Sequence, residues 1–185
     1  MNAPVDISNV VLKTERLIIR PWKLSDLDDF FEYASKEGVG EAAGWSHHKS
    51  KEESLEILTR FIDHKKTFAL EYKGKVIGSI GVEESDDEPE ELKDLKCRAI
   101  GCILSKDYWG QGLMPEAVKE VIKYCFDELK LDYLVYCHYV WNLRSKRVKE
   151  KCGFTVHHIT KHETKLGTVE DTVVSILKRE DYYKM

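Results

Sequence analysis

The sequence has no long hydrophobic run, few prolines and glycines, and no excess of basic residues. Four prolines and eleven glycines among 185 residues exclude a collagen-like or low-complexity chain. No apolar segment approaches the roughly 18 residues that a membrane span needs. The first residues have neither the basic region nor the apolar core of a secretory signal. We therefore expect a cytoplasmic protein with no membrane partner.

The charge balance argues against one large class of partners. Twenty-nine Lys and Arg face 33 Asp and Glu, which gives a net charge of −4. Nucleic-acid binding depends on a basic surface that neutralises phosphates. We therefore expect no nucleic-acid partner.

The five cysteines follow neither a disulfide nor a metal-binding pattern. Their number is odd, and no Cys-x-x-Cys spacing occurs, so we expect no structural zinc site. Cysteines inside apolar segments usually behave as small hydrophobic residues, which indicates reduced thiols. His157, His158 and His162 have no acidic or cysteine partners at ligand spacing. We interpret these histidines as surface residues and expect no metal.

Alternating short strands and amphipathic helices predict a single α+β domain over residues 1–185, with a mixed, mostly antiparallel sheet of about seven strands and about four helices. Capping boxes at Ser25-x-x-Asp28 and Ser50-x-x-Glu53 are typical of helix starts. Lys73-Gly74 predicts a hairpin turn, and Gly153 suits the left-handed end of a helix. The expected strands cover 17–19, 67–72, 76–82, 99–104, 133–139, 154–159 and 171–177.

Residues 83–94 carry eight acidic side chains against one lysine. Such charge density is not buried without partners, so we expect a solvated loop between two strands. A functional interpretation is also open. The loop would attract a cationic substrate such as a basic N-terminus, a polyamine or an aminoglycoside.

The most informative segment runs from Ile100 to Ala117, where an apolar strand leads through a glycine-rich turn into a helix. Gly110 and Gly112 let the backbone turn tightly and let a ligand approach its N–H groups. The first N–H groups of a helix have no internal partners, and the helix dipole favours negative charge there. The segment fits a phosphate or pyrophosphate. It matches neither the P-loop nor the Gly-x-Gly-x-x-Gly spacing, so a tight strand–helix connection without a ligand stays open.

Two separated blocks resemble one known family. Tyr108-Trp109-Gly110-Gln111-Gly112-Leu113-Met114-Pro115-Glu116-Ala117 is similar to the acetyl-CoA pyrophosphate loop of GNAT N-acetyltransferases. The block from Asn142 to Phe154 resembles the Asn-x-x-Ser and Glu-Lys-x-Gly-Phe motifs of the branch that contains the ribosomal-protein N-terminal acetyltransferases RimJ and RimL. Thr14 to Pro21 resembles the N-terminal strand of that branch.

The resemblance implies a GNAT-like fold, acetyl-CoA as cosubstrate and an amine acceptor. Backbone N–H groups of the loop would hold the pyrophosphate, and the strand before it would splay from its neighbour, so that its backbone pairs with the pantetheine arm. Asn142 matches a side chain that contacts this arm, and Ser145 matches a serine proposed in some members to stabilise the departing thiolate. The residues implied to bind the cofactor are Ile103, Leu104, Trp109, Gly110, Gln111, Gly112, Leu113, Met114 and Asn142.

Several roles stay open at this stage. Asn142 also suits a plain helix N-cap, and Ser145 also suits a solvated first helical turn. Glu83 and His138 are weak candidates for a general base, since a lone strand histidine is more often structural. The family's usual acidic residue and tyrosine around Ile100-Gly101 are Ala99 and Cys102 here, which leaves the acid–base assignment uncertain.

Three interpretations therefore compete. The leading one is an acetyl-CoA-dependent N-acetyltransferase, monomeric or homodimeric, in which a primary amine attacks directly within a ternary complex. The acceptor would be a protein N-terminal α-amine, a polyamine or another small amine. The alternatives are a related enzyme that uses a longer acyl donor and a catalytically weak protein of the same fold that binds or senses acyl-CoA.

Overall fold

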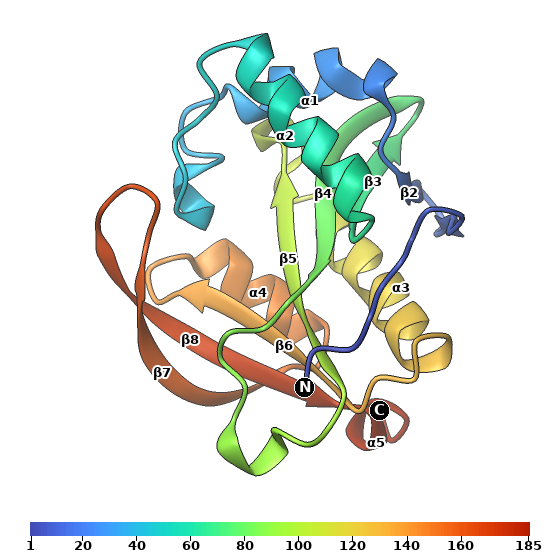
Figure 1. The fold of residues 1–185 in the computed structure, drawn as a ribbon, viewed down its shortest axis with the longest axis vertical. Coiled ribbons are helices and arrows are strands. Elements are labelled where there is room, and N and C mark those ends of the chain that lie inside the picture. The colour runs from blue at the N-terminus through green and yellow to red at the C-terminus, as the bar shows by residue number, and fades with distance from the viewer.

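The computed structural model describes residues 1–185, which form an eight-stranded mixed sheet with helices on both faces (Figure 1). The strand order is β1-β2-β3-β4-β5-β6-β8-β7, and every neighbouring pair is antiparallel except β5 and β6. The strands are β1 (Leu12–Lys13), β2 (Leu17–Pro21), β3 (Thr67–Tyr72), β4 (Lys75–Glu83), β5 (Cys97–Leu104), β6 (Tyr133–Tyr139), β7 (Thr155–Glu163) and β8 (Val169–Lys178). The helices are α1 (Leu27–Ala34), α2 (Lys51–His64), α3 (Leu113–Asp127), α4 (Leu143–Lys151) and α5 (Arg179–Tyr182).

Separate hydrophobic clusters fix the helices to the two faces of the sheet. The largest joins α3, through residues such as Ala117 and Val121, to the strands β2–β5. A second cluster packs α1 and α2 through Phe30 and Leu58 against Ala69 and Val76 on the other side. The expected α+β architecture with a mostly antiparallel sheet is confirmed. The elements that the sequence missed are the two-residue strand β1, the four-residue helix α5 and four three-residue 3-10 turns, which are too short to show a periodic pattern.

Local turn and capping predictions are confirmed in part. Lys73 and Gly74 both adopt positive φ, 51° and 80°, as the predicted hairpin requires. Ser50 caps α2 by accepting a hydrogen bond from the Glu53 N–H at 3.2 Å.

The capping box predicted at Ser25 and Asp28 is wrong. A 3-10 turn over Leu24–Asp26 leads into α1 instead. The Asp26 carboxylate accepts from the Lys23 N–H at 2.8 Å and pairs with Arg20 at 2.9 Å. The ion pair with Arg20 fixes the Asp26 carboxylate, and α1 begins after it, at Leu27. A local sequence motif cannot reveal this ion pair.

The acidic segment 83–94 has more regular structure and more contacts with the rest of the protein than the predicted solvated loop. Glu83 ends β4, and Glu90–Leu92 form a 3-10 turn with a buried Leu92. The Asn2 side chain both donates to the Ser85 carbonyl at 3.0 Å and accepts from the Ser85 N–H at 2.8 Å. The N-terminal residues therefore hold this segment in place, although most of its acidic side chains stay in contact with solvent.

The parallel pair β5 and β6 separates halfway along its length. Backbone pairing is confined to Cys97–Tyr133, Arg98–Leu134 and Ala99–Val135. Beyond Ala99 the two strands diverge, while β5 stays paired with β4 as far as Leu104. The splay that the family resemblance implied is confirmed, and it opens one edge of each strand toward the site described next.

Candidate active site

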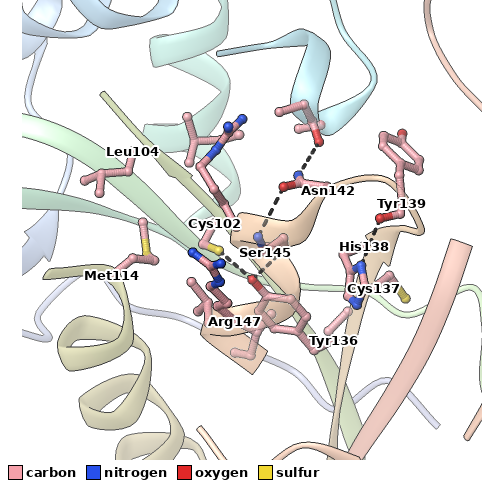
Figure 2. Close-up of a pocket in the computed structure, with 18 of the residues that line it drawn as sticks. Cys102, Leu104, Met114, Tyr136, Cys137, His138, Tyr139, Asn142, Ser145 and Arg147 are labelled. Atoms are coloured by element: carbon pink, nitrogen blue, oxygen red, sulfur yellow. Dashed lines mark hydrogen bonds between the residues drawn. The ribbon is translucent and has the colours of Figure 1, made fainter. Parts of the chain in front are cut away.

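A cavity of about 550 Å³ lies in the splay between β5 and β6, within the range of small-ligand sites. Its walls are the ends of β5 and β6, the glycine-rich turn before α3, one face of α4 and the segment 83–87. Figure 2 shows the part of the lining around Cys102, Tyr136 and Ser145. Every residue named as a candidate from the sequence lines this cavity except Gln111. The glycine-rich turn and the Asn142 block, which are about 30 positions apart in the sequence, thus meet at one cavity together with the segment 83–87.

The glycine-rich turn presents a row of free backbone donors. Gly110 and Gly112 adopt φ of 78° and 77°, a region that residues with a Cβ avoid. The N–H groups of residues 110 to 114 donate to no acceptor within the protein, whereas the Trp109 N–H bonds the Lys106 carbonyl at 3.2 Å. Five consecutive free donors at the N-terminus of a 15-residue helix have the geometry that suits a phosphate group.

Arg16, which lies outside the cavity, forms hydrogen bonds that stabilise this turn. Its Nη1 donates to the Gln111 carbonyl at 3.0 Å, and its Nε donates to Glu116 in the first turn of α3 at 2.7 Å. The carbonyl of Gln111 is therefore held away from the free N–H groups. The N-terminal strand block thus has a physical role at the site, because it supplies this arginine.

Trp109 links the turn to the two walls of the splay. Its indole N–H donates to the Leu104 carbonyl at 2.9 Å, and the Arg144 guanidinium lies 3.8 Å from the centre of its ring. The carbonyl of Ile103 lies against Gly78 on β4, the side away from the splay. Since backbone groups alternate in direction along a strand, Cys102 and Leu104 present their backbone groups toward β6. The expectation that the Ile103 backbone faces the splay is therefore wrong, because Ile103 is paired with Ser79 on β4.

Helix α4 contributes a cationic face that we did not identify from the sequence. Arg144, Arg147 and Lys151 line the cavity and are otherwise exposed. Their spacing of three and four residues places them on one face of a helix. That spacing was the available signal, but a basic helix surface is common and does not by itself indicate phosphate binding.

Asn142 is the N-cap of α4. Its Oδ1 accepts from the Ser145 N–H at 3.1 Å, and its Nδ2 donates to the Ala42 carbonyl at 3.1 Å. Both ends of the amide are thus occupied within the protein, and the residue is only 9% exposed. The capping role considered from the sequence is confirmed, and the same contacts hold the 40–44 turn against the rim of the cavity.

Ser145 belongs to a short polar chain inside the splay. Its Oγ lies 2.9 Å from the Tyr136 hydroxyl, which lies 3.1 Å from the Cys102 Sγ (Figure 2). Burial raises the pKa of Tyr136 well above its usual value and that of Cys102 to about 11. Both groups are therefore protonated at neutral pH. Tyr136 was not among the residues we singled out from the sequence.

The two candidate bases occupy different environments. His138 is buried, and its Nδ1 lies 2.9 Å from the Tyr139 carbonyl; burial lowers its pKa. As the carbonyl can only accept, Nδ1 carries the proton and Nε2 is an unprotonated atom with no partner. Glu83 accepts from the Thr67 hydroxyl at 2.8 Å and pairs with Lys66 at 3.1 Å, so both of its oxygens are engaged.

The opposite end of the cavity carries negative charge. Glu83, Glu84, Asp86 and Asp87 all line it. Glu84 pairs with Arg98 and Lys66 at 3.3 and 3.5 Å, whereas Asp86 and Asp87 form no ion pair. One cavity therefore has cations on the α4 side and uncompensated carboxylates on the side of the 83–87 segment.

The chain matches one protein family. A family model described as an acetyltransferase (GNAT) domain matches residues 16–155. The curated Bacillus subtilis protein "Probable N-acetyltransferase YjcK" is 40% identical over 89 residues, which are 47% of this chain and 49% of that protein. The match thus spans about half the length of that relative.

Two solved structures share the fold. The microcin C7 self-immunity acetyltransferase MccE, solved with acetyl-CoA and AMP, has a TM-score of 0.74 at 15% identity, with 89% of this chain and 93% of that chain covered. The ribosomal-protein-S5-alanine acetyltransferase from Vibrio fischeri has a TM-score of 0.71 at 22% identity, with 94% and 99% covered. None of the helices combines the length and apolar character that crossing a bilayer requires.

Proposed function

The chain belongs to the GNAT acetyltransferase family, and on that basis we propose that it transfers the acetyl group of acetyl-CoA to a primary amine. The single observation that carries the proposal is the row of free N–H groups from residue 110 to residue 114, which opens α3 at the mouth of the splay. Such a row suits the pyrophosphate of CoA, because it supplies several fixed donors and the positive end of a helix.

The remaining lining of the cavity fits the rest of this cosubstrate. Arg144, Arg147 and Lys151 would offset phosphate charge on the α4 side. The free edge of β5 at Cys102 and Leu104 would pair with the amides of the pantetheine arm, although the Leu104 carbonyl already accepts from Trp109. In this arrangement the thioester lies between the strands, near Ser145.

We place the acceptor amine at the acidic end of the cavity. Asp86 and Asp87 line the cavity, and the ion pairs of this segment involve Glu83 and Glu84 instead, so Asp86 and Asp87 would attract an ammonium group and lose little by binding one. The bound ammonium first loses a proton to water, and the neutral amine nitrogen then forms a bond to the thioester carbonyl carbon. The carbon–sulfur bond breaks, the sulfur leaves as a thiolate, and the amine releases a proton to water.

An α-amine is the acceptor that this site favours. An α-amino group has a pKa of about 8, whereas a lysine side chain has one near 10.4, so the α-amine needs less help from a base. Glu83 is engaged with Thr67 and Lys66, and His138 is buried. We therefore propose a protein or peptide N-terminus, as in the RimJ and RimL branch, with polyamines and other small amines as competing acceptors.

The proposal is tested by an acceptor screen with a matched pair of variants. Peptides with free α-amines, polyamines and aminoglycosides are incubated with acetyl-CoA, and release of the CoA thiol is measured. Asp86→Asn with Asp87→Asn raises the KM for the acceptor and leaves the Kd for acetyl-CoA unchanged. Asp94→Asn, an exposed carboxylate of the same segment outside the cavity, changes neither value.

Two outcomes contradict the proposal. Turnover that is equally fast after Asp86 and Asp87 are neutralised would place the acceptor elsewhere. Binding of acetyl-CoA without turnover of any amine would instead support the acyl-CoA-binding protein considered from the sequence.

A further inference from the structure

The Tyr136 hydroxyl bridges the two strands of the splay at the level where their backbones have separated. The last backbone pair is Ala99–Val135. Tyr136, the next residue of β6, reaches the Cys102 thiol on β5 at 3.1 Å and the Ser145 hydroxyl on α4 at 2.9 Å (Figure 2). All three side chains line the cavity.

The tyrosine ring is held firmly. Tyr136 is 1% exposed, and its ring packs against Phe154 with 5.4 Å between centroids. The backbone of Ser145 is also held, because its N–H donates to the Asn142 side chain. Backbone and hydroxyl contacts thus fix Ser145 from two directions, which is more than a solvated first-turn serine needs.

The number of hydroxyl and thiol protons determines the direction of the hydrogen bonds among Cys102, Tyr136 and Ser145. Tyr136 has a single hydroxyl proton and two neighbours that each carry a proton of their own. Since an oxygen accepts far better than a sulfur, the favoured arrangement runs from the Cys102 S–H to the Tyr136 oxygen, and from the Tyr136 O–H to the Ser145 oxygen. The Ser145 hydroxyl has no partner other than Tyr136, so its own proton is left free to point into the cavity.

We propose that Tyr136 is a positioning residue that turns the Ser145 O–H toward the sulfur of the bound thioester. The inference rests on the proposed function. As the carbon–sulfur bond breaks, the sulfur takes the bonding pair and accepts a hydrogen bond from Ser145. The Tyr136 proton stays on its oxygen, because a buried phenolate is strongly disfavoured. Each bond in such a chain polarises the next, so Tyr136 makes the final donor stronger.

A double-mutant cycle tests this assignment. kcat and KM are measured for the wild type, Tyr136→Phe, Ser145→Ala and the double variant. Tyr136→Phe keeps the ring and removes one hydrogen bond, so we expect kcat to fall roughly 3- to 10-fold with the Kd for acetyl-CoA unchanged. In the Ser145→Ala background the same substitution should have no further effect, because the two residues act as one unit.

A second measurement does not depend on turnover. Bound CoA is titrated with pH while the absorbance of its thiolate is followed. A donor aimed at the sulfur lowers the pKa of the bound thiol, so we expect that pKa to rise in Tyr136→Phe and in Ser145→Ala, and to rise no further in the double variant. Cys102→Ala should show a smaller rise than Tyr136→Phe, and Cys102→Ser, which restores a donor, should reverse it.

The controls separate this inference from the proposed function. Tyr133→Phe removes a buried hydroxyl from the same strand outside the cavity and should leave kcat and the thiol pKa unchanged. Additive effects in the cycle, or an unchanged thiol pKa in Tyr136→Phe, would overturn the inference while leaving acetyl transfer intact. Failure of the wild type to bind CoA would overturn both.

Discussion

The indole N–H of Trp109 donates to the backbone carbonyl of Leu104 at 2.9 Å, and the Arg144 guanidinium lies 3.8 Å from the centre of the same indole. One side chain therefore ties the glycine-rich turn to the end of β5 and to α4. The turn needs such a tie, because its own N–H groups are committed to no partner in the protein.

Replacing Trp109 should loosen the turn. Trp109→Phe removes a hydrogen bond, worth about 0.5–1.5 kcal/mol, and weakens the contact with Arg144. We expect the Kd for acetyl-CoA to rise roughly 3- to 10-fold, with the fold retained by circular dichroism. Phe keeps most of the apolar packing, so we expect little loss of thermal stability. A clear loss of thermal stability with an unchanged Kd for acetyl-CoA would contradict a role of Trp109 in binding.

The positive φ of Gly112 should be required for cofactor binding. A Cβ at this position meets only Arg16 at 3.6 Å, so Gly112→Ala acts through backbone strain of roughly 1–2 kcal/mol rather than through a clash. We expect the turn to relax and the Kd for acetyl-CoA to rise at least about tenfold.

Gly74 is the matched control for this variant. It also has positive φ, 80°, and open space around it, but it lies in the β3–β4 hairpin. Gly74→Ala should cost comparable stability and leave acetyl-CoA binding unchanged. Equal effects of the two substitutions on Kd would show that stability alone explains the result.

The cationic face of α4 should contribute to CoA binding in a salt-dependent way. Arg147→Gln with Lys151→Gln removes two charges from the cavity wall, and each charged hydrogen bond is worth about 1.5–3 kcal/mol. We expect Kd to rise at least about tenfold and to depend less on ionic strength. Lys146→Gln, on the same helix but outside the cavity and near Glu150 at 3.9 Å, is the control and should leave both properties unchanged.

The free energy of unfolding should decrease as the pH is lowered, because of His138. Burial lowers its pKa, so the folded state stays neutral where the unfolded chain, with a histidine pKa near 6.5, takes up a proton. The unfolded state then binds more protons, and the free energy of unfolding decreases as the pH falls below that value. Urea unfolding gives the free energy of unfolding at about pH 7.5 and at about pH 5.5. The difference between these two free energies should be smaller for His138→Gln than for the wild type.

His48 contributes in the same direction, since burial also lowers its pKa. The His138 variant should therefore reduce the pH dependence without abolishing it, and His48→Gln combined with His138→Gln should reduce it further. An unchanged difference between the two pH values in His138→Gln would show that this histidine is protonated in the folded protein.

Most of the sheet was predictable because its strands have strong local signals. Thr67–Tyr72 and Tyr133–Tyr139 combine β-branched and aromatic residues between clear turn residues, and the structure reproduces both ranges. The Asp26–Arg20 pair and the Asn2–Ser85 contacts were not predictable, because they join positions whose proximity only the fold creates.

The sequence predicted that the glycine-rich turn and the Asn142 block share one candidate site, and both line the same cavity, but the contacts inside this cavity were not predictable. Sequence blocks identify residues that gather at one place. They do not show that Trp109 occupies the Leu104 carbonyl, or that Tyr136 bridges Cys102 and Ser145. Tyr136 has the same apolar-strand pattern as its buried neighbours, and only the splay brings its hydroxyl to both Cys102 and Ser145.

Calorimetric titration of the wild type and of Gly112→Ala with acetyl-CoA tests the central claim most directly. We expect micromolar binding by the wild type with one site per chain and a marked loss of affinity in the variant, since the free N–H groups of residues 110–114 are proposed to hold the pyrophosphate. No binding by a folded wild-type protein, or equal affinity in the two proteins, would contradict the assignment of this turn as the CoA site.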